Sequence, residues 1–171
     1  MILHILRHAE AVERTPTIEE EHRYLTGPGR VRFRKACGRI RKLGVKPDLI
    51  VTSPLVRAVQ TADILAERLK YEGEILLDAQ LASGFDPEGI DALLKRYGKA
   101  AELVIVGHEP DFGRLTAALL GIASPCSLKK GGMVSLKLDK KGKSAEFLFL
   151  TTGSGKAFTA RGEAIERLQQ G

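Results

Sequence analysis

The sequence predicts an α/β fold of three layers, in which a mostly parallel central sheet lies between two layers of helices. Two observations lead to this prediction. Short apolar segments of strand length alternate with longer segments whose apolar residues recur at helical spacing. The segment 103–106, Leu-Val-Ile-Val, is a continuous apolar run, as expected of a strand that is buried on both faces. Such alternation is typical of parallel sheets that helices cover on both sides.

The elements are expected in the order βαβαβαβα, followed by an antiparallel hairpin and a terminal helix. Strands are expected from apolar and β-branched runs at residues 2–6, 48–52, 75–77, 103–106, 133–138 and 145–150. The first four helices are expected from apolar stripes at helical spacing over residues 33–43, 58–69, 90–97 and 112–119.

Individual residues mark the ends of these elements. Residues 26–29, Thr-Gly-Pro-Gly, open the first helix, and Gly44 ends it. Asp111 is expected to cap the fourth helix. Residues 139–143 are rich in turn formers, so they should connect the two strands of the hairpin.

The composition predicts one globular domain over residues 1–171. The chain has the length of a single domain, and its apolar content of 43% and charged content of 28% are globular values. No apolar run approaches the roughly 20 residues that a membrane-spanning helix needs. Met1 leads directly into the first strand without a signal-like segment. We therefore expect a soluble, cytoplasmic protein with no membrane partner.

The formal charge of +6 favours acidic substrates or partners. The basic residues of 30–42 interleave with an apolar stripe, which predicts a solvated helix face rather than a nucleic-acid surface. The chain also has no tryptophan, so no nucleic-acid partner is expected. Cys37 and Cys126 lie far apart with no metal-ligand spacing, and we expect both to be free thiols.

Residues 9–24 form a long polar connection that includes the acidic run 19–21. Connections of this length are uncommon in a compact domain unless they are functional loops or lids. We expect such a role here.

Polar residues follow three of the predicted strands, at the point where each strand ends. Arg7 and His8 follow the first strand, Arg57 follows the second, and His108 follows the buried strand. Because the carboxyl ends of parallel strands meet at one edge of the sheet, these four side chains are expected to surround one site. Two arginines and two histidines around one point would bind a dianion strongly.

This set of side chains predicts phosphoryl chemistry without a metal or cofactor. Nearby arginines lower the pKa of a histidine, so His8 is expected to be neutral near pH 7 and able to attack phosphorus. The guanidiniums would stabilise charge on the phosphoryl oxygens. The sequence offers no carboxylate cluster to hold magnesium. Taken singly, Arg57 could equally form a salt bridge at a helix end, and His108 could be a hydrogen-bonded structural residue.

Three segments, 6–10, 53–61 and 106–110, resemble the signature blocks of the histidine phosphatase superfamily. They are most similar to its small SixA-type phosphohistidine phosphatase branch. The match spans residues 1–120 in order and spacing, with Ala9 where the family usually has glycine.

The resemblance implies a phosphoglycerate mutase-like fold in which His8 is the phospho-accepting nucleophile. Arg7, Arg57 and His108 would bind the phosphoryl group. The resemblance also aligns residues 23–26 with the segment before the family's first helix, so Arg23 is either at the pocket rim or a solvated loop residue.

The identity of the general acid bears on the substrate. Relatives often have Glu-Leu before the third helix, where this chain has Gln80 and Leu81. Asp86 and Glu109 are the other candidates, although Glu109 could instead only favour the N-terminus of the following helix through its dipole. Expelling an alkoxide requires a proton donor, whereas the imidazole that leaves phosphohistidine has an unperturbed pKa of about 6.5.

We therefore expect the chain to dephosphorylate phosphohistidine on a protein of the histidine phosphotransfer type. A phosphatase or mutase that acts on small phosphorylated substrates, in the same fold, is one alternative, and a non-catalytic phosphate-binding module is another. The intact His8 argues against the binding module, and Gln80 argues against phosphate esters.

Four further features have simpler interpretations. Residues 153–156, Gly-Ser-Gly-Lys, do not fit the phosphate-binding P-loop pattern and are expected to be a flexible connection to the last helix. His4 lies inside the first strand, so we predict a core histidine. Lys129 and Lys130 either add positive charge to the rim of the site or belong to a solvated turn.

Overall fold

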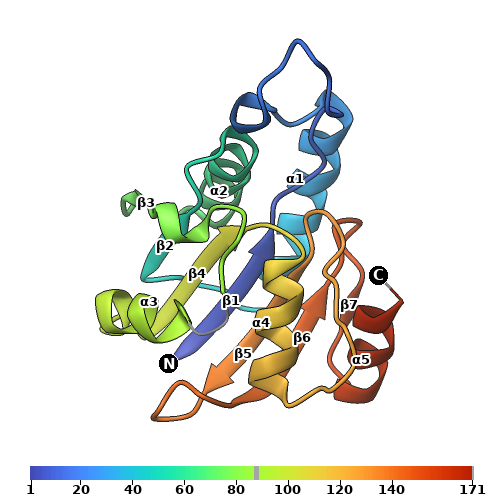
Figure 1. The fold of residues 1–171 in the computed structure, drawn as a ribbon. Helices are drawn as coiled ribbons and strands as arrows, with labels where there is room; N and C mark the ends of the chain where they lie inside the picture. The colour runs from blue at the N-terminus through green and yellow to red at the C-terminus, as the bar shows by residue number, and fades with distance from the viewer. Residues whose placement is uncertain (87–88, 171) are drawn as a thin grey trace.

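The computed structural model describes residues 1–86 and 89–170, which form a central sheet between two layers of helices (Figure 1). The strand order within these residues is β3-β2-β4-β1-β5-β6-β7. The strands that pair in parallel are β1 (Ile2–Arg7), β2 (Leu49–Thr52), β3 (Ile75–Leu77) and β4 (Glu102–Gly107). The strands added in antiparallel pairing are β5 (Met133–Leu138), β6 (Ala145–Thr151) and β7 (Ala157–Phe158).

The helices cover both faces of the sheet, as predicted. Helices α1 (Gly27–Lys42) and α2 (Val56–Leu69) contribute to one apolar cluster. Helices α3 (Ile90–Tyr97), α4 (Asp111–Leu120) and α5 (Arg161–Gln169) contribute to the other (Figure 1). In β4, Leu103 and Ile105 pack in one cluster, and Val104 and Val106 pack in the other. The continuous apolar run of this strand therefore serves both faces, and the predicted three-layer α/β architecture is confirmed.

The predicted start of the first helix is also confirmed. The Thr26 hydroxyl accepts a hydrogen bond from the amide of Gly29 at 2.9 Å, and a proline lies in the first turn. Gly29 is required by a close approach, because a Cβ at this position would lie 2.4 Å from the carbonyl oxygen of Glu10. The helix is thereby held against the start of the 9–24 connection. At its other end the chain turns at Gly44, which has a φ of +86°.

Asp111 does not cap α4, in contrast to the sequence-based expectation. It is the first residue of the helix, and the capping position is Pro110, which makes no side-chain cap. The Asp111 carboxylate instead accepts hydrogen bonds from the amides of Gly84 and Phe85, at 2.7 and 3.1 Å. It also pairs with Arg114. Its role is to attach the segment after the 3-10 helix η2 (Ala79–Leu81) to α4.

Residues 153–156 are not the flexible connection that their composition predicted. The amide of Thr152 donates to the carbonyl of Lys156, and the amide of Gly155 donates to the carbonyl of Thr152, both at 2.9 Å. These bonds form a turn that joins β6 to β7, a two-residue edge strand that the sequence did not predict.

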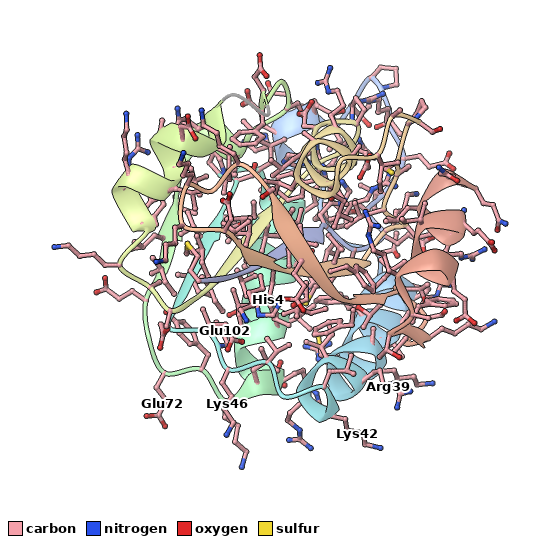
Figure 2. All side chains as sticks on the ribbon, turned by 90° about the horizontal axis from the view of Figure 1, so that it is seen from below. His4, Arg39, Lys42, Lys46, Glu72 and Glu102 are labelled. Carbon is pink, nitrogen blue, oxygen red and sulfur yellow. The ribbon has the colours of Figure 1, made fainter. Side chains whose placement is uncertain are left out.

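The two cysteines and the basic helix face agree with expectation. Cys37 and Cys126 are buried and free. Along α1, the exposed basic residues are Arg32, Lys35, Arg39, Arg41 and Lys42, and Figure 2 shows Arg39 and Lys42 on its outer side. No helix in the described part of the chain is long and apolar enough to cross a membrane.

His4 is a core histidine, as predicted. It is 2% exposed, and its Nε2 lies 2.9 Å from Oε1 of Glu102. The same carboxylate oxygen accepts a hydrogen bond from the amide of Lys46 at 2.6 Å, and Figure 2 shows the three residues near one another in the view from below. Burial raises the pKa of Glu102, but the hydrogen bonds from His4 and from the Lys46 amide outweigh burial and lower it overall.

We expect Glu102→Gln to lower the free energy of unfolding at pH 7 by about 1–2 kcal/mol, because a charged acceptor becomes a neutral one. A carboxylate whose pKa is lowered by folding stabilises the protein above its unfolded-state pKa, and this contribution is lost as the pH falls through the folded-state pKa. Urea unfolding should therefore show the difference from wild type shrinking below roughly pH 4. The exposed Glu72, labelled in the same view, gives the control Glu72→Gln, with an expected change of less than about 0.5 kcal/mol (Figure 2). A difference that is constant with pH would contradict the prediction.

Candidate active site

The ends of three parallel strands meet at one pocket of about 230 Å³. Arg7 is the last residue of β1, His8 follows it, and His108 follows β4. Arg57 lies in the first turn of α2, just beyond β2. All four side chains line the pocket, so the structure brings together the residues that the sequence placed at three separate strand ends.

His8 is held as a neutral imidazole whose Nε2 is unprotonated. Its Nδ1 lies 2.7 Å from the carbonyl oxygen of Ala9, which can only accept, so Nδ1 carries the proton. Nε2 accepts a hydrogen bond of 3.3 Å from Nε of Arg57. The pKa of His8 is lowered to about 3, mainly by burial and further by the charges of His108, Arg57 and Arg7.

Burial therefore lowers the pKa of His8 more than repulsion from the arginines does. The sequence predicted a neutral His8 from that repulsion. The segment around it is tied down by Thr61, whose hydroxyl accepts from the amide of Ala9 at 3.0 Å and donates to the carbonyl of Arg57 at 2.6 Å. Ala9 is 2% exposed. The residue that departs from the family's usual glycine is thus accommodated within the core.

His108 is oriented by Ser53, the first residue after β2. The Nε2 of His108 lies 2.8 Å from the Ser53 hydroxyl oxygen, and the centres of the His8 and His108 rings are 5.2 Å apart. Burial, followed by repulsion from Arg57, lowers the pKa of His108 to about 4. Both histidines are therefore neutral near pH 7.

Arg7 is fixed from the opposite side. Its Nη1 donates to the carbonyl of Leu128 at 2.6 Å. Its Nε is buried and has no hydrogen-bond partner among the described residues, and the same is true of Nδ1 of His108. Unpaired buried polar atoms are costly. Two side chains that line the pocket thus each carry a buried polar atom that no described residue satisfies.

The 9–24 connection folds over the pocket and places Glu20, in the 3-10 helix η1 (Glu20–His22), among its arginines. The Glu20 carboxylate accepts from Nη2 of Arg57 at 2.9 Å, from Nη1 of Arg23 at 2.9 Å and from Nε of Arg14 at 2.8 Å. Its backbone carbonyl accepts from Nη1 of Arg57 at 2.7 Å. The hydrogen bond from Arg14 is the main reason that the pKa of Glu20 falls to about 2. This carboxylate therefore occupies arginine donors that a phosphoryl group would otherwise use.

The sequence predicted a lid in this region but did not identify Glu20. Arg23 lies at the pocket rim rather than in solvent, with its side chain 15% exposed and its Nε donating to the carbonyl of Val12 at 2.9 Å. The signal for Glu20 in the sequence was that it is an acidic residue between two arginines in a polar connection. Its partner Arg57, 37 residues away along the chain, could not be read from that signal.

Of the two candidate acids, Glu109 lines the pocket and Asp86 does not; Gln80 does not line it either. Burial raises the pKa of Glu109, and its Oε1 accepts from the amide of Leu128 at 3.0 Å. Gly113 leaves room for this carboxylate, because a Cβ there would lie 2.7 Å from Oε2 of Glu109. A carboxyl group with a raised pKa can hold a proton that a leaving group needs. Within the described residues, no three His, Cys, Asp or Glu side chains are grouped as metal ligands would be.

Comparison with known proteins links this geometry to one family. The profile of the histidine phosphatase superfamily (branch 1) matches residues 3–83. An uncharacterized protein of Picosynechococcus sp. is 36% identical over 145 residues, which cover 80% of this chain and 85% of that protein. The mitochondrial serine/threonine-protein phosphatase Pgam5 of Drosophila virilis is 34% identical over 68 residues, 40% of this chain and 23% of that protein.

Among solved structures, the fold is similar to that of the protein histidine phosphatase SixA in complex with tungstate. The TM-score is 0.79 at 22% sequence identity, and the match covers 90% of this chain and 97% of that one. This similarity is one of fold, that is, of the arrangement of helices and strands.

We expect Glu20→Gln to bind orthophosphate about fivefold more tightly than the wild type at pH 7. The substitution removes the charge that competes for Arg23 and Arg57, and an ion pair with a partly exposed partner is worth up to about 1 kcal/mol. Isothermal titration calorimetry measures the affinity. Glu19→Gln is the matched control, because Glu19 lies on the same segment and pairs with the exposed His22 instead. Weaker binding in Glu20→Gln would show that Glu20 instead holds the arginines in place for the anion.

Proposed function

This chain belongs to the histidine phosphatase superfamily, and on that premise we propose that it is a phosphatase, which hydrolyses phosphohistidine through a covalent intermediate on His8. The observation that carries the proposal is the lone pair on Nε2 of a buried, neutral His8, which lies beside Arg57 in a cationic pocket. A neutral imidazole among fixed guanidiniums can attack phosphorus while the cations hold the phosphoryl oxygens.

In the first step, Nε2 of His8 forms a bond to phosphorus as the bond from phosphorus to the substrate nitrogen breaks. The electron pair of the broken bond leaves with the substrate imidazole, which takes up a proton from solvent. Nδ1 of His8 keeps its proton and continues to donate it to the carbonyl of Ala9, so the ring keeps its orientation as it gains charge. Arg7, Arg57 and His108 bind the oxygens of the transferring group.

In the second step, water attacks phosphorus and the bond from phosphorus to Nε2 breaks. The electron pair returns to His8, and the protons of water go to orthophosphate and to solvent. The neutral His8 that results is the form that its burial favours, so the free enzyme is ready for another cycle.

The leaving group favours phosphohistidine over an alkyl phosphate. An imidazole leaves with little help, because its unperturbed pKa is about 6.5, whereas an alkoxide requires a strong proton donor. Gln80, at the position where relatives often carry an acid, lies outside the pocket and cannot donate an acidic proton. The fold similarity to a protein histidine phosphatase supports the same substrate class. The proposed partner is a phosphorylated protein of the histidine phosphotransfer type, reached in the cytoplasm.

Incubation with a phosphohistidine-bearing phosphotransfer protein and with p-nitrophenyl phosphate tests this function. We expect a higher kcat/KM for phosphohistidine, and a loss of about 10³-fold or more on both substrates in His8→Ala, because the nucleophile is removed. Wild type that is denatured with detergent at alkaline pH during turnover should carry a base-stable, acid-labile phosphoryl group that the variant lacks. His22→Ala, an exposed histidine on the lid, serves as the control and should retain activity. Activity that survives in His8→Ala would refute the mechanism, and a strong preference for sugar phosphates would refute the substrate.

Glu109 favours a second candidate function, the hydrolysis of phosphate esters by the same nucleophile. Its carboxyl group lines the pocket with a raised pKa, which suits a general acid. Pgam5, which resembles part of this chain, is named as a serine/threonine-protein phosphatase. Glu109 would then protonate a leaving alkoxide or phenoxide.

We expect Glu109→Gln to lower kcat/KM for phenyl phosphate by about 10²-fold and for phosphohistidine by less than about threefold, because only the phenoxide needs an acid. The glutamine oxygen can still accept from the Leu128 amide, so the local structure is kept. Wild-type activity on phenyl phosphate should fall as the pH rises through the pKa of Glu109, and the variant should lack this pH dependence. An equal loss on both substrates would assign Glu109 a purely structural role.

A further inference from the structure

A second cleft adjoins the pocket on the side of β6 and α5. We call it the basic cleft; its volume is about 540 Å³. Its cationic residues are Arg7, Arg32, Lys129, Lys130 and Arg167. Its other polar side chains are hydroxyls, and none of the described residues that line it is a carboxylate.

The basic cleft is continuous with the pocket. Arg7 and Lys130 line both cavities. The guanidinium of Arg7 donates to the carbonyl of Leu128, the residue before Lys129. The amide of Gly131 lies 3.2 and 3.0 Å from the carbonyl oxygens of Arg7 and His8. The loop that carries the two lysines is therefore held in a fixed position relative to the nucleophile.

The turn over residues 152–156 forms the far wall of the cleft. A Cβ at Gly153 would lie 2.0 Å from the carbonyl oxygen of Lys130, so glycine allows this turn to pack directly on the lysine loop. The hydroxyls of Thr152 and Ser154 lie 2.9 Å apart. The Gly-Ser-Gly-Lys segment is not a P-loop; it instead forms one wall of the basic cleft.

Most of the charge in the cleft is uncompensated. Arg32 pairs with Glu10 at 2.5 Å. Lys129, Lys130 and Arg167 make no ion pair with any carboxylate in the described part of the chain. Unpaired cations on one surface attract a partner of opposite charge and orient it during the encounter.

We propose that the basic cleft binds acidic side chains that flank the phosphorylated residue of a protein substrate. The cleft is lined by cationic side chains, and its residues Lys129, Lys130 and Ser154 are exposed, so a segment of another protein can reach it. An acidic segment in the cleft would place its phosphorylated side chain over His8, because the two cavities share Arg7. This inference rests on the proposed function for the identity of that side chain.

Binding of two fluorescent peptides, measured by anisotropy, tests the proposal without any turnover. Both carry a stable phosphohistidine analogue; one is flanked by Asp and Glu, and the other by Ser and Gln. We expect the wild type to bind the acidic peptide about tenfold more tightly at low ionic strength, with the preference decreasing as salt is added. Equal affinities for the two peptides would overturn the proposal.

The double variant Lys129→Ala/Arg167→Ala should reduce this preference to about threefold or less, because each exposed ion pair contributes up to about 1 kcal/mol. Neither residue lines the pocket, so hydrolysis of p-nitrophenyl phosphate should be unchanged. Lys140→Ala/Lys141→Ala, on the exposed turn between β5 and β6, removes the same charge elsewhere and should keep the full preference. An equal loss in both double variants would overturn the proposal by showing that only net charge matters.

Two further results separate the alternatives. If methylenebisphosphonate bound more tightly than orthophosphate through Lys129 and Arg167 while the peptides bound equally, the cleft would hold a second small anion and the proposal would fail. If the peptide preference were present but phosphohistidine were not hydrolysed, the proposed function would fail and the cleft would still be supported as a site for acidic segments.

Discussion

The parallel pairing of β4 with both β1 and β2 is the constraint on which the rest of the site depends. In this register Arg7 lies beside Gly107 and Thr52 lies beside Val106, so the three strands end at the same level. The chain continues this pairing by one bond past each end, from the amide of His8 to the carbonyl of Gly107 and from the amide of Ser53 to that of Val106. His8, His108 and the hydroxyl partner of His108, Ser53, are thereby placed by backbone hydrogen bonds rather than by flexible side chains.

The pocket combines positive charge with buried neutral imidazoles, and each depends on the other. Burial keeps His8 and His108 uncharged, which limits the repulsion that four cations around one cavity would otherwise produce. The arginines are fixed by backbone carbonyls, such as those of Leu128 and Glu20, which leaves the histidines free of structural ion pairs. His4 lies within β1, and its hydrogen bond to Glu102 belongs to the core. The chain thus carries a core histidine within β1 and a pocket histidine directly after this strand.

The sequence predicted the features that depend on local pattern. Apolar periodicity located the helices and strands, and residue type at three strand ends located the pocket.

Features that depend on contacts between distant segments were missed or misassigned. The carboxylate of Asp111 looks like a helix cap in sequence but bonds to amides at 84 and 85. In the sequence, nothing distinguishes Glu20 from the other acidic residues of 9–24, because its contact with Arg57 forms only in the folded chain. The close approach of Gly153 to Lys130 likewise appears only in three dimensions.

The position of Glu20 also bears on how the enzyme behaves between catalytic cycles. Its carboxylate contacts Arg14, Arg23 and Arg57, so the site carries its own counter-anion. Orthophosphate, the product, must compete with a tethered group whose effective concentration is set by the chain rather than by the surroundings. We therefore expect product inhibition to be weak. A substrate that brings additional contacts outside the pocket would displace the tethered carboxylate more readily than free phosphate does.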